Sequence, residues 1–261
     1  MSPGYTVEDG LIVAGTWDNI KGVVRNDYNS RNSEITSLGW NTELVANDDW
    51  TLALDLNYSK VEREDIILET NAGTGRNING ALDTLGFRLT DDGVTQFTSL
   101  LNYADPNLIK ITSAQGWGGD VIPEGQAGYM NTPSITDEIK AVRLSATRAL
   151  HQSPFRAITY GFNYTERQKE FVNDQFYLGV PGGGDLTVPT NLLLEPTDLG
   201  YLGISQVISY DALGLVNSGA LNLIRNPNAD VLSGNWEVTE KVTTAYIKAD
   251  IDHTLFGLPL T

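Results

Sequence analysis

A strict alternation of apolar and polar residues is the feature that most constrains how this chain can fold. From residue 50 onward the even positions are apolar: Trp50, Leu52, Leu54, Leu56 and Tyr58. The odd positions between and after them are small or polar: Thr51, Ala53, Asp55, Asn57 and Ser59. Successive side chains of a β-strand point to opposite faces, so this pattern predicts a strand with one apolar face, bounded by aromatic residues, and one polar face.

The same alternation recurs in residues 36–46, 138–150, 155–167 and 242–252. Their apolar rows contain Leu38, Trp40 and Leu44; Val142, Leu144, Ala146 and Leu150; Ile158, Tyr160, Phe162 and Tyr164; and Ala245, Ile247, Ala249 and Ile251. The opposite rows include Glu43, Arg143, Asn163 and Lys248. Five such segments predict an antiparallel all-β fold, with strands of about 11 to 15 residues that exceed the length usual in globular proteins.

The connections between these segments are of two kinds. Residues 47–49 and 151–154 are short polar turns, and residues 253–258 are expected to form another, with Pro259 beginning the next strand. Residues 65–135 and 172–237 are very long connections, in which we expect a strand near 85–90 and helical turns near 105–112 and 205–215. Short turns at one end and long loops at the other are typical of an outer-membrane β-barrel.

Composition excludes several classes of protein. The chain has 33 acidic and 17 basic residues, a formal charge of -16, which argues against a nucleic-acid partner. It has no cysteine, hence no disulfide or thiolate site. No apolar run is long enough for a transmembrane helix. No signal peptide precedes the first strand. Because a membrane barrel must be exported, the barrel interpretation implies that the sequence begins inside a longer protein.

Alternation alone does not show which face contacts water. In a soluble sandwich the apolar face meets a second sheet, whereas in a membrane barrel it meets lipid and the polar face lines the lumen. Aromatic residues at the ends of the rows, charged residues at mid-strand and the length of the strands favour the barrel. The alternative is a secreted all-β carbohydrate-binding module. The two differ in whether Trp50, Leu54, Tyr160 and Phe162 are covered by protein.

Several longer motifs resemble a known family. They include Val23-Val24-Arg25-Asn26-Asp27-Tyr28, Leu38-Gly39-Trp40-Asn41, Tyr58-Ser59-Lys60-Val61-Glu62-Arg63-Glu64, Tyr103-Ala104-Asp105-Pro106-Asn107, Phe162-Asn163-Tyr164-Thr165-Glu166-Arg167 and Thr244-Ala245-Tyr246-Ile247-Lys248-Ala249-Asp250. Each stretch is short, but together they resemble the barrel region of TonB-dependent receptors, most closely the proteobacterial branch associated with oligosaccharide uptake, and the resemblance extends over nearly the whole chain.

The resemblance implies a 22-stranded barrel in the outer membrane of a Gram-negative bacterium, closed by a plug domain and energised through TonB. The nutrient would be an oligosaccharide or otherwise an iron chelate. Residues 1–261 contain no plug domain, no TonB box and no terminal strand ending in an aromatic residue. Because five or six strands cannot close a barrel of that size, the chain is expected to be one partial barrel domain, with outer-membrane lipid and its own plug as partners.

Candidate ligand-binding residues are aromatic residues in the long connections: Trp117, Tyr129, Phe176, Tyr177 and Tyr201. Exposed aromatic rings can stack on sugar rings; the alternative is that they pin the loops to one another or to the barrel rim. We expect no cofactor and no enzymatic activity, because no nucleophile and base occur together in a recognisable motif.

Other chemical motifs are weak. His151 and His253 fall in expected turns and have no evident partner ligands, so no metal site is predicted. Asp48-Asp49 and Asp91-Asp92 lack the spacing of a calcium loop and are interpreted as solvated turns. Gly182-Gly183-Gly184 is not followed by the Gly-Lys-Ser/Thr of a phosphate-binding loop.

Overall fold

A computed structural model of the chain describes residues 1–122, 125–151, 154–251, 253–255 and 258–260. The fold is all-β, with 63% of residues in strands and 6% in helices, and its sheets are antiparallel. The chain divides into two compact units. Unit 1 comprises Met1–Ser30, Asp65–Thr132 and Asp174–Val231, and unit 2 comprises Arg31–Glu64, Pro133–Asn173 and Leu232–Thr261.

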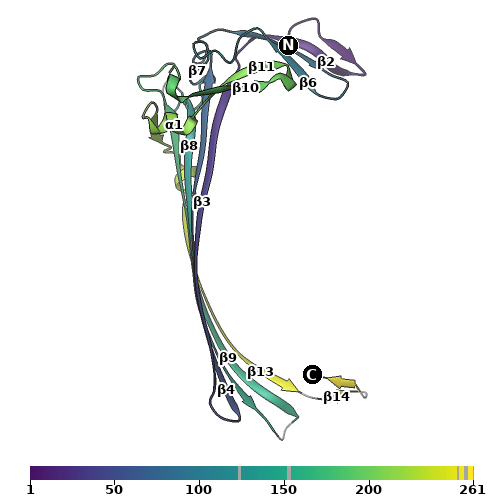
Figure 1. Ribbon diagram of the computed structural model, residues 1–261, viewed down its shortest axis with the longest axis vertical. Coiled ribbons are helices and arrows are strands. Elements are labelled where there is room, and N and C mark those ends of the chain that lie inside the picture. The colour runs from purple at the N-terminus through teal and green to yellow at the C-terminus, as the bar shows by residue number, and fades with distance from the viewer. Residues whose placement is uncertain (123–124, 152–153, 252, 256–257, 261) are drawn as a thin grey trace. The chain divides into compact units, whose positions relative to one another are not determined.

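Five long strands run alongside one another in a single layer (Figure 1). They are β3 (Val24–Val45), β4 (Trp50–Gly73), β8 (Gly128–Ala149), β9 (Phe155–Gly179) and β13 (Trp236–Ile251). Their order across the sheet is β3, β4, β8, β9, β13. All five segments predicted from the alternation are therefore strands. They form no closed barrel among the described residues, since β3 and β13 are free edges within unit 2.

The strands are longer than predicted. The first four contain 22, 24, 22 and 25 residues, and β13 contains 16. Ladder hydrogen bonds join backbone groups, so pairing continues beyond the point at which one face stops being apolar. The alternation marks only the part of each strand whose two faces meet different environments.

The two predicted hairpin turns are tight. At the β3–β4 turn the side-chain oxygen of Asn47 accepts hydrogen bonds from the backbone N–H groups of Asp49 and Trp50, both at 3.0 Å. At the β8–β9 turn the backbone N–H of Leu150 donates to the carbonyl oxygen of Arg156 at 2.9 Å, while Gln152 and Ser153 lie outside the described residues. The third turn, expected over 253–258, is wrong for its described residues, because His253–Leu255 and Leu258–Leu260 pair as strands β14 and β15; residues 256–257 lie outside the described part.

The long connections contain secondary structure, as expected, and more of it than the one strand and two helical turns that were predicted. Residues 65–135 and 172–237 contain the outer parts of the long strands together with smaller elements. The smaller elements of the chain are β1 (Thr6–Glu8), β2 (Leu11–Ile20), β5 (Asp83–Leu89), β6 (Thr95–Ser99), β7 (Lys110–Ile111), η1 (Thr190–Leu192), β10 (Leu193–Leu199), η2 (Gly200–Leu202), β11 (Ile204–Tyr210), α1 (Ala212–Asn217), β12 (Asn222–Arg225) and α2 (Ala229–Leu232). Strands β1, β2, β5 and β6 form one small sheet, and β10 and β11 form another.

Local expectations within these segments have mixed outcomes. The strand near 85–90 is confirmed as β5. Near 105–112 one helical turn is present, in which the N–H of Ile109 donates to the carbonyl of Asp105 at 2.8 Å, before β7 begins. The helical turn expected over 205–215 is wrong in its first half, because Ile204–Tyr210 pairs with β10 as a strand. Helix α1 starts only after Asp211, whose side chain accepts a hydrogen bond from the N–H of Gly214.

Unit 1 has a hydrophobic core. Its most buried apolar side chains are Leu68, Ile109, Ile111, Leu178 and Leu215. They come from β4, the β6–β8 connection, β9 and α1, so residues far apart in sequence form one cluster. This core explains why the long connections fold.

Unit 2 has no such core. Every side chain classed as buried in the described part of the chain belongs to unit 1. Along β3 from Arg31 to Val45, and along β13 from Trp236 to Ala249, the residues are exposed throughout. The part of the long sheet that belongs to unit 2 is therefore one layer, with no second sheet or helix packed against it among the described residues.

Candidate functional site: an uncovered apolar band

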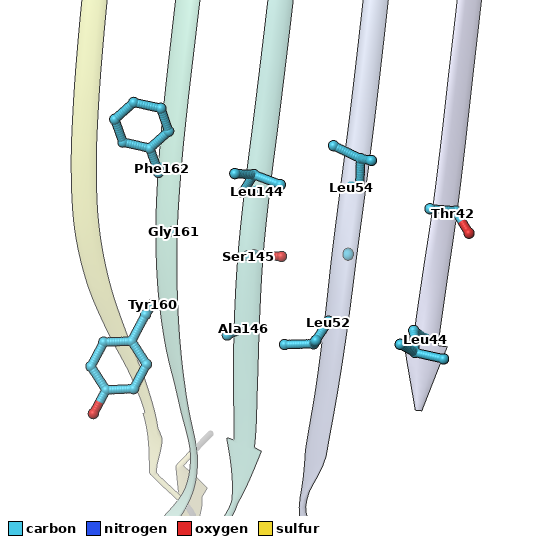
Figure 2. A pocket seen from close by; sticks show the side chains of 11 residues that line it. Thr42, Leu44, Leu52, Leu54, Leu144, Ser145, Ala146, Tyr160, Gly161 and Phe162 are labelled. Carbon is cyan, nitrogen blue, oxygen red and sulfur yellow. The ribbon is translucent and has the colours of Figure 1, made fainter. Parts of the chain in front are cut away.

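The apolar rows of the five strands form one surface of unit 2, which we call the apolar face. Figure 2 shows side chains from four neighbouring strands on this face, which line a shallow hollow: Leu44 from β3, Leu52 and Leu54 from β4, Leu144 from β8, and Tyr160 and Phe162 from β9. The register continues the face onto β13, where Ala245 pairs with Phe162 and Ile247 pairs with Tyr160. Exposure is high, reaching 63% for Trp40 and 73% for Ile247.

The opposite surface is the polar face. The amide of Asn41 donates to the carboxylate of Asp55 at 3.1 Å, and the hydroxyl groups of Thr147 and Thr159 lie 3.0 Å apart. Polar residues line much of a second hollow on the polar face, among them Asp55, Asn57, Arg143, Asn163, Thr165 and Thr244. The predicted separation of the two faces is therefore confirmed on all five strands.

One border of the apolar band consists of tyrosines joined to carboxylates. The hydroxyl of Tyr58 donates to Glu138 at 3.2 Å, which links β4 to β8. The hydroxyl of Tyr164 donates to Glu166 at 2.8 Å. Each ring thus belongs to the apolar row while its hydroxyl reaches a charged group, the arrangement that amphipathic aromatic side chains adopt at a boundary between apolar and wet surroundings.

Paired charges follow directly beyond these tyrosines. Lys60 pairs with Glu62 at 2.6 Å, Lys140 pairs with Glu138, and Lys241 pairs with Glu166 at 3.5 Å across β13 and β9. All occupy the same alternating positions as the apolar rows. The face therefore changes from apolar to charged at a similar level on β4, β8, β9 and β13.

The other border lies near the short turns. The guanidinium of Arg148 on β8 lies over the ring of Trp50 on β4, 5.7 Å from its centroid. Next to it in the turn, His151 contacts Asp49 at 3.0 Å. The band on β4 thus extends from Trp50 to Tyr58, nine consecutive residues between two borders where aromatic side chains meet charges.

No protein-family model matches the chain, and no curated protein sequence matches it significantly. Among the described residues, no helix is long and apolar enough to cross a membrane.

The predicted ligand-binding aromatic residues are spread over unit 1. Trp117, 47% exposed, and Tyr201, 69% exposed in η2, lie in connecting segments as expected. The location predicted for the other three is wrong, because Tyr129 is in β8 and Phe176 and Tyr177 are in β9. Backbone pairing extends these strands beyond the alternating part, which the sequence pattern did not reveal.

These three residues also have structural contacts. Tyr129 is hydrogen-bonded to Glu69, and burial raises the pKa of its phenol. Phe176 pairs with Arg225 and Tyr177 pairs with Ile224 between β9 and β12. The hydroxyl of Tyr177 accepts a hydrogen bond from the amide of Asn228 at 3.3 Å. Their contacts favour the interpretation that they fix local structure, and only Trp117 and Tyr201 present a largely open ring.

The other motifs occupy turns. His151 lies in the β8–β9 turn with its side chain 70% exposed, and the side chain of His253 is outside the described part. Asp91 and Asp92 form the β5–β6 turn, where Gly93 has a φ of 82°. Over the ranges that the structure describes, no group of three or more His, Asp or Glu residues could hold a metal ion.

Two features of the band were not predicted from the sequence. Arg148 occupies an even position within the apolar row of 138–150, and the charges of Lys60, Glu138 and Glu166 continue the apolar rows of their strands. A change from apolar to charged residues at constant two-residue spacing was the available signal. This change indicates a border of the band only when neighbouring strands change at the same level, and that depends on how the strands pair across the sheet.

Proposed function

We propose that the long sheet of unit 2 is part of an outer-membrane β-barrel whose apolar face contacts lipid. The observation that carries this proposal is the uncovered apolar band. A contiguous surface of exposed leucine, tyrosine and phenylalanine side chains is rare on soluble monomers and marks contact with a partner or a membrane. The rival fold, a soluble sandwich, requires a sheet over Trp50, Leu54, Tyr160 and Phe162, and unit 2 supplies none among its described residues.

The height of the band supports lipid as the partner. Nine residues of β4 separate its two borders, a length of roughly 26 Å along an extended strand. A tilted transmembrane strand needs about 9 to 11 residues. Tyrosine and tryptophan at the two borders match the aromatic girdles found where barrels meet the two lipid–water interfaces.

The free edges support a larger barrel. β3 and β13 each present unpaired backbone groups over most of their length within unit 2, and exposed edges of this kind are a liability unless paired. In this proposal further strands of the protein pair with both edges. The polar face, with Asp55, Arg143 and Asn163, then faces the lumen.

The receptor function is the more specific part of the proposal. It rests on the resemblance to TonB-dependent receptors, which would make the protein an uptake receptor for a nutrient such as an oligosaccharide, working with a plug domain and TonB. The structured loops of unit 1 and the open rings of Trp117 and Tyr201 are compatible with nutrient capture.

The lipid-facing assignment is tested with two neighbouring substitutions on β8. Leu144→Arg adds a charge to the apolar face, and Ser145→Arg adds the same charge to the polar face. An arginine on the lipid side of a barrel at the bilayer midplane costs about 2 to 4 kcal/mol, whereas substitutions on the lumen side are tolerated. We expect Leu144→Arg to lower the yield of folded chain in detergent micelles or phosphatidylcholine bilayers strongly, with little loss for Ser145→Arg.

The unsubstituted chain provides the first readout. We expect it to aggregate in plain buffer and to gain a β-sheet circular dichroism signal with detergent. A monodisperse, cooperatively melting β-protein without detergent, equally tolerant of arginine at both positions, would rule out the lipid-facing assignment.

A further inference from the structure

The β8–β9 hairpin carries an unusual charge for this chain. No Asp or Glu occurs between Glu138 and Glu166, although the chain has 33 acidic residues against 17 basic ones. The same interval contains Lys140, Arg143, Arg148 and Arg156. A locally positive hairpin therefore lies within a strongly acidic protein.

Two of these arginines lie next to the turn. Arg148 is on the apolar face, because its guanidinium lies over the ring of Trp50. Arg156, at the start of β9, is level with the end of β8, since its carbonyl oxygen accepts the hydrogen bond from Leu150. Both side chains are exposed, and neither guanidinium has a carboxylate partner in the part of the chain that the structure describes. Asp49, an acidic group beside the described part of this turn, contacts His151 at 3.0 Å.

The position of Arg148 determines what can neutralise it. Its stem leaves β8 beside the apolar band, and its charged group is held at the band's edge by an aromatic ring. A long basic side chain at such a border places its stem along apolar surface and its head among polar groups. Where that border meets a bilayer, the anions within reach are lipid phosphates, which a guanidinium can bind with two parallel hydrogen bonds.

We propose that the turn end of the β8–β9 hairpin binds the phosphate groups of anionic phospholipids through Arg148 and Arg156, with the ring of Trp50 positioning Arg148. This inference rests on the proposed lipid contact and specifies the headgroup at one border of the band. The net charge alone predicts the opposite behaviour, because an anionic bilayer repels a chain of formal charge -16.

The test dilutes the urea-solubilised full chain at low salt into two kinds of vesicle, phosphatidylcholine alone and phosphatidylcholine with added phosphatidylglycerol, and separates vesicle-bound chain from aggregate by flotation in a density gradient. The measured quantity is the ratio of the two partition coefficients. We expect the wild-type chain to prefer the anionic vesicles, and expect Arg148→Gln to reduce the ratio roughly fivefold, the factor that corresponds to about 1 kcal/mol for one arginine at the membrane surface. Arg156→Gln should have a similar effect.

Arg143→Gln is the matched control. It removes the same charge from the same strand, but Arg143 lies on the polar face, beside Asp55 and Asn163. We expect its ratio to equal that of the wild type. Equal losses from Arg143→Gln and Arg148→Gln would mean that only net charge matters and would overturn the inference, as would a wild-type chain without preference for anionic vesicles.

The two proposals fail differently. Binding to phosphatidylcholine vesicles without an anionic preference would overturn the headgroup assignment and leave the lipid-facing assignment intact. Absence of binding to either vesicle would overturn both.

Discussion

Two buried tyrosines make the stability of unit 1 depend on pH. The hydroxyl of Tyr103 donates to the carboxylate of Asp83 at 3.0 Å, and the hydroxyl of Tyr210 lies 2.9 Å from that of Thr70. Burial raises the pKa of each phenol from 10.0 to about 12, and the negative charge of Asp83 adds to the effect on Tyr103. These side chains thus favour the neutral form in the folded state.

The consequence is a loss of stability at high pH. In the unfolded chain a phenol ionises near its ordinary pKa, whereas in the folded unit it stays protonated to about 12. The stabilisation from the raised pKa is complete below about pH 10 and is lost as the pH rises towards 12, at most about 2 to 3 kcal/mol for Tyr210 and less for Tyr103, whose phenol is less deeply buried. We expect Tyr210→Phe to flatten the fall of the unfolding free energy between about pH 10 and pH 12, measured by urea unfolding of the detergent-solubilised chain.

Tyr201→Phe is the control for this prediction, since Tyr201 is 69% exposed. Its pH dependence should match that of the wild type. If Tyr210→Phe and Tyr201→Phe give the same slope, ionisation of the buried phenol is not the cause.

At the scale of the strand, the pairing of β9 with β13 depends on one glycine. Gly161 pairs with Tyr246, and the tyrosine ring covers the position that a side chain at residue 161 would occupy. A Cβ atom at residue 161 would lie 2.1 Å from the ring carbon Cζ of Tyr246, too close for a real contact. The absence of a side chain on β9 therefore lets an aromatic residue of β13 lie flat on the polar face.

We expect Gly161→Ala to displace the ring of Tyr246, which is 38% exposed and can move, and to destabilise the β9–β13 pair by about 1 kcal/mol, the low end of the range for overpacking. The double variant Gly161→Ala/Tyr246→Ala should recover part of this loss, which a double-mutant cycle of urea unfolding free energies would reveal. Gly39→Ala is the matched control on β3, because the nearest atoms to its added Cβ are 3.9 Å away. A loss for Gly39→Ala as large as that for Gly161→Ala would show that the effect is a general cost of replacing glycine in these strands.

At the scale of the whole chain, the two units differ in what stabilises them. Unit 1 buries Leu68, Ile111, Leu178 and Leu215 in a core of its own. Unit 2 has no buried side chain among its described residues, so its sheet is held by backbone pairing and surface contacts alone. A single-layer sheet of this kind needs an apolar environment on one side to be stable.

We therefore expect hydrogen exchange to respond to detergent in one unit more than in the other. Backbone amides of residues 50–58 and 158–164 should exchange quickly without detergent and become strongly protected in micelles, because the opening of these strands would then expose apolar surface. Amides of the unit 1 core, such as those around Ile111, should change much less. Equal protection of the band with and without detergent would indicate that the sheet is stable without lipid.

Local sequence patterns were enough to predict the five long strands, their two faces and two of the three short turns. These properties follow from alternation with period two and from turn residues such as Asn47, which act between near neighbours in the chain. The expected strand over 85–90 was confirmed for the same reason, whereas Ile204–Tyr210, expected as part of a helical turn, forms a strand because β10 lies beside it.

The remaining features depend on contacts between residues that are distant in the sequence. The core of unit 1 joins residues as distant as Leu68 and Leu215, and the borders of the band exist because Tyr58 meets Glu138 and Trp50 meets Arg148 across neighbouring strands. Pairing register aligns these residues, and register is a property of two strands together. A local pattern therefore identified the faces, while the extent of the strands, the folding of the long connections and the charged borders required contacts between distant parts of the chain.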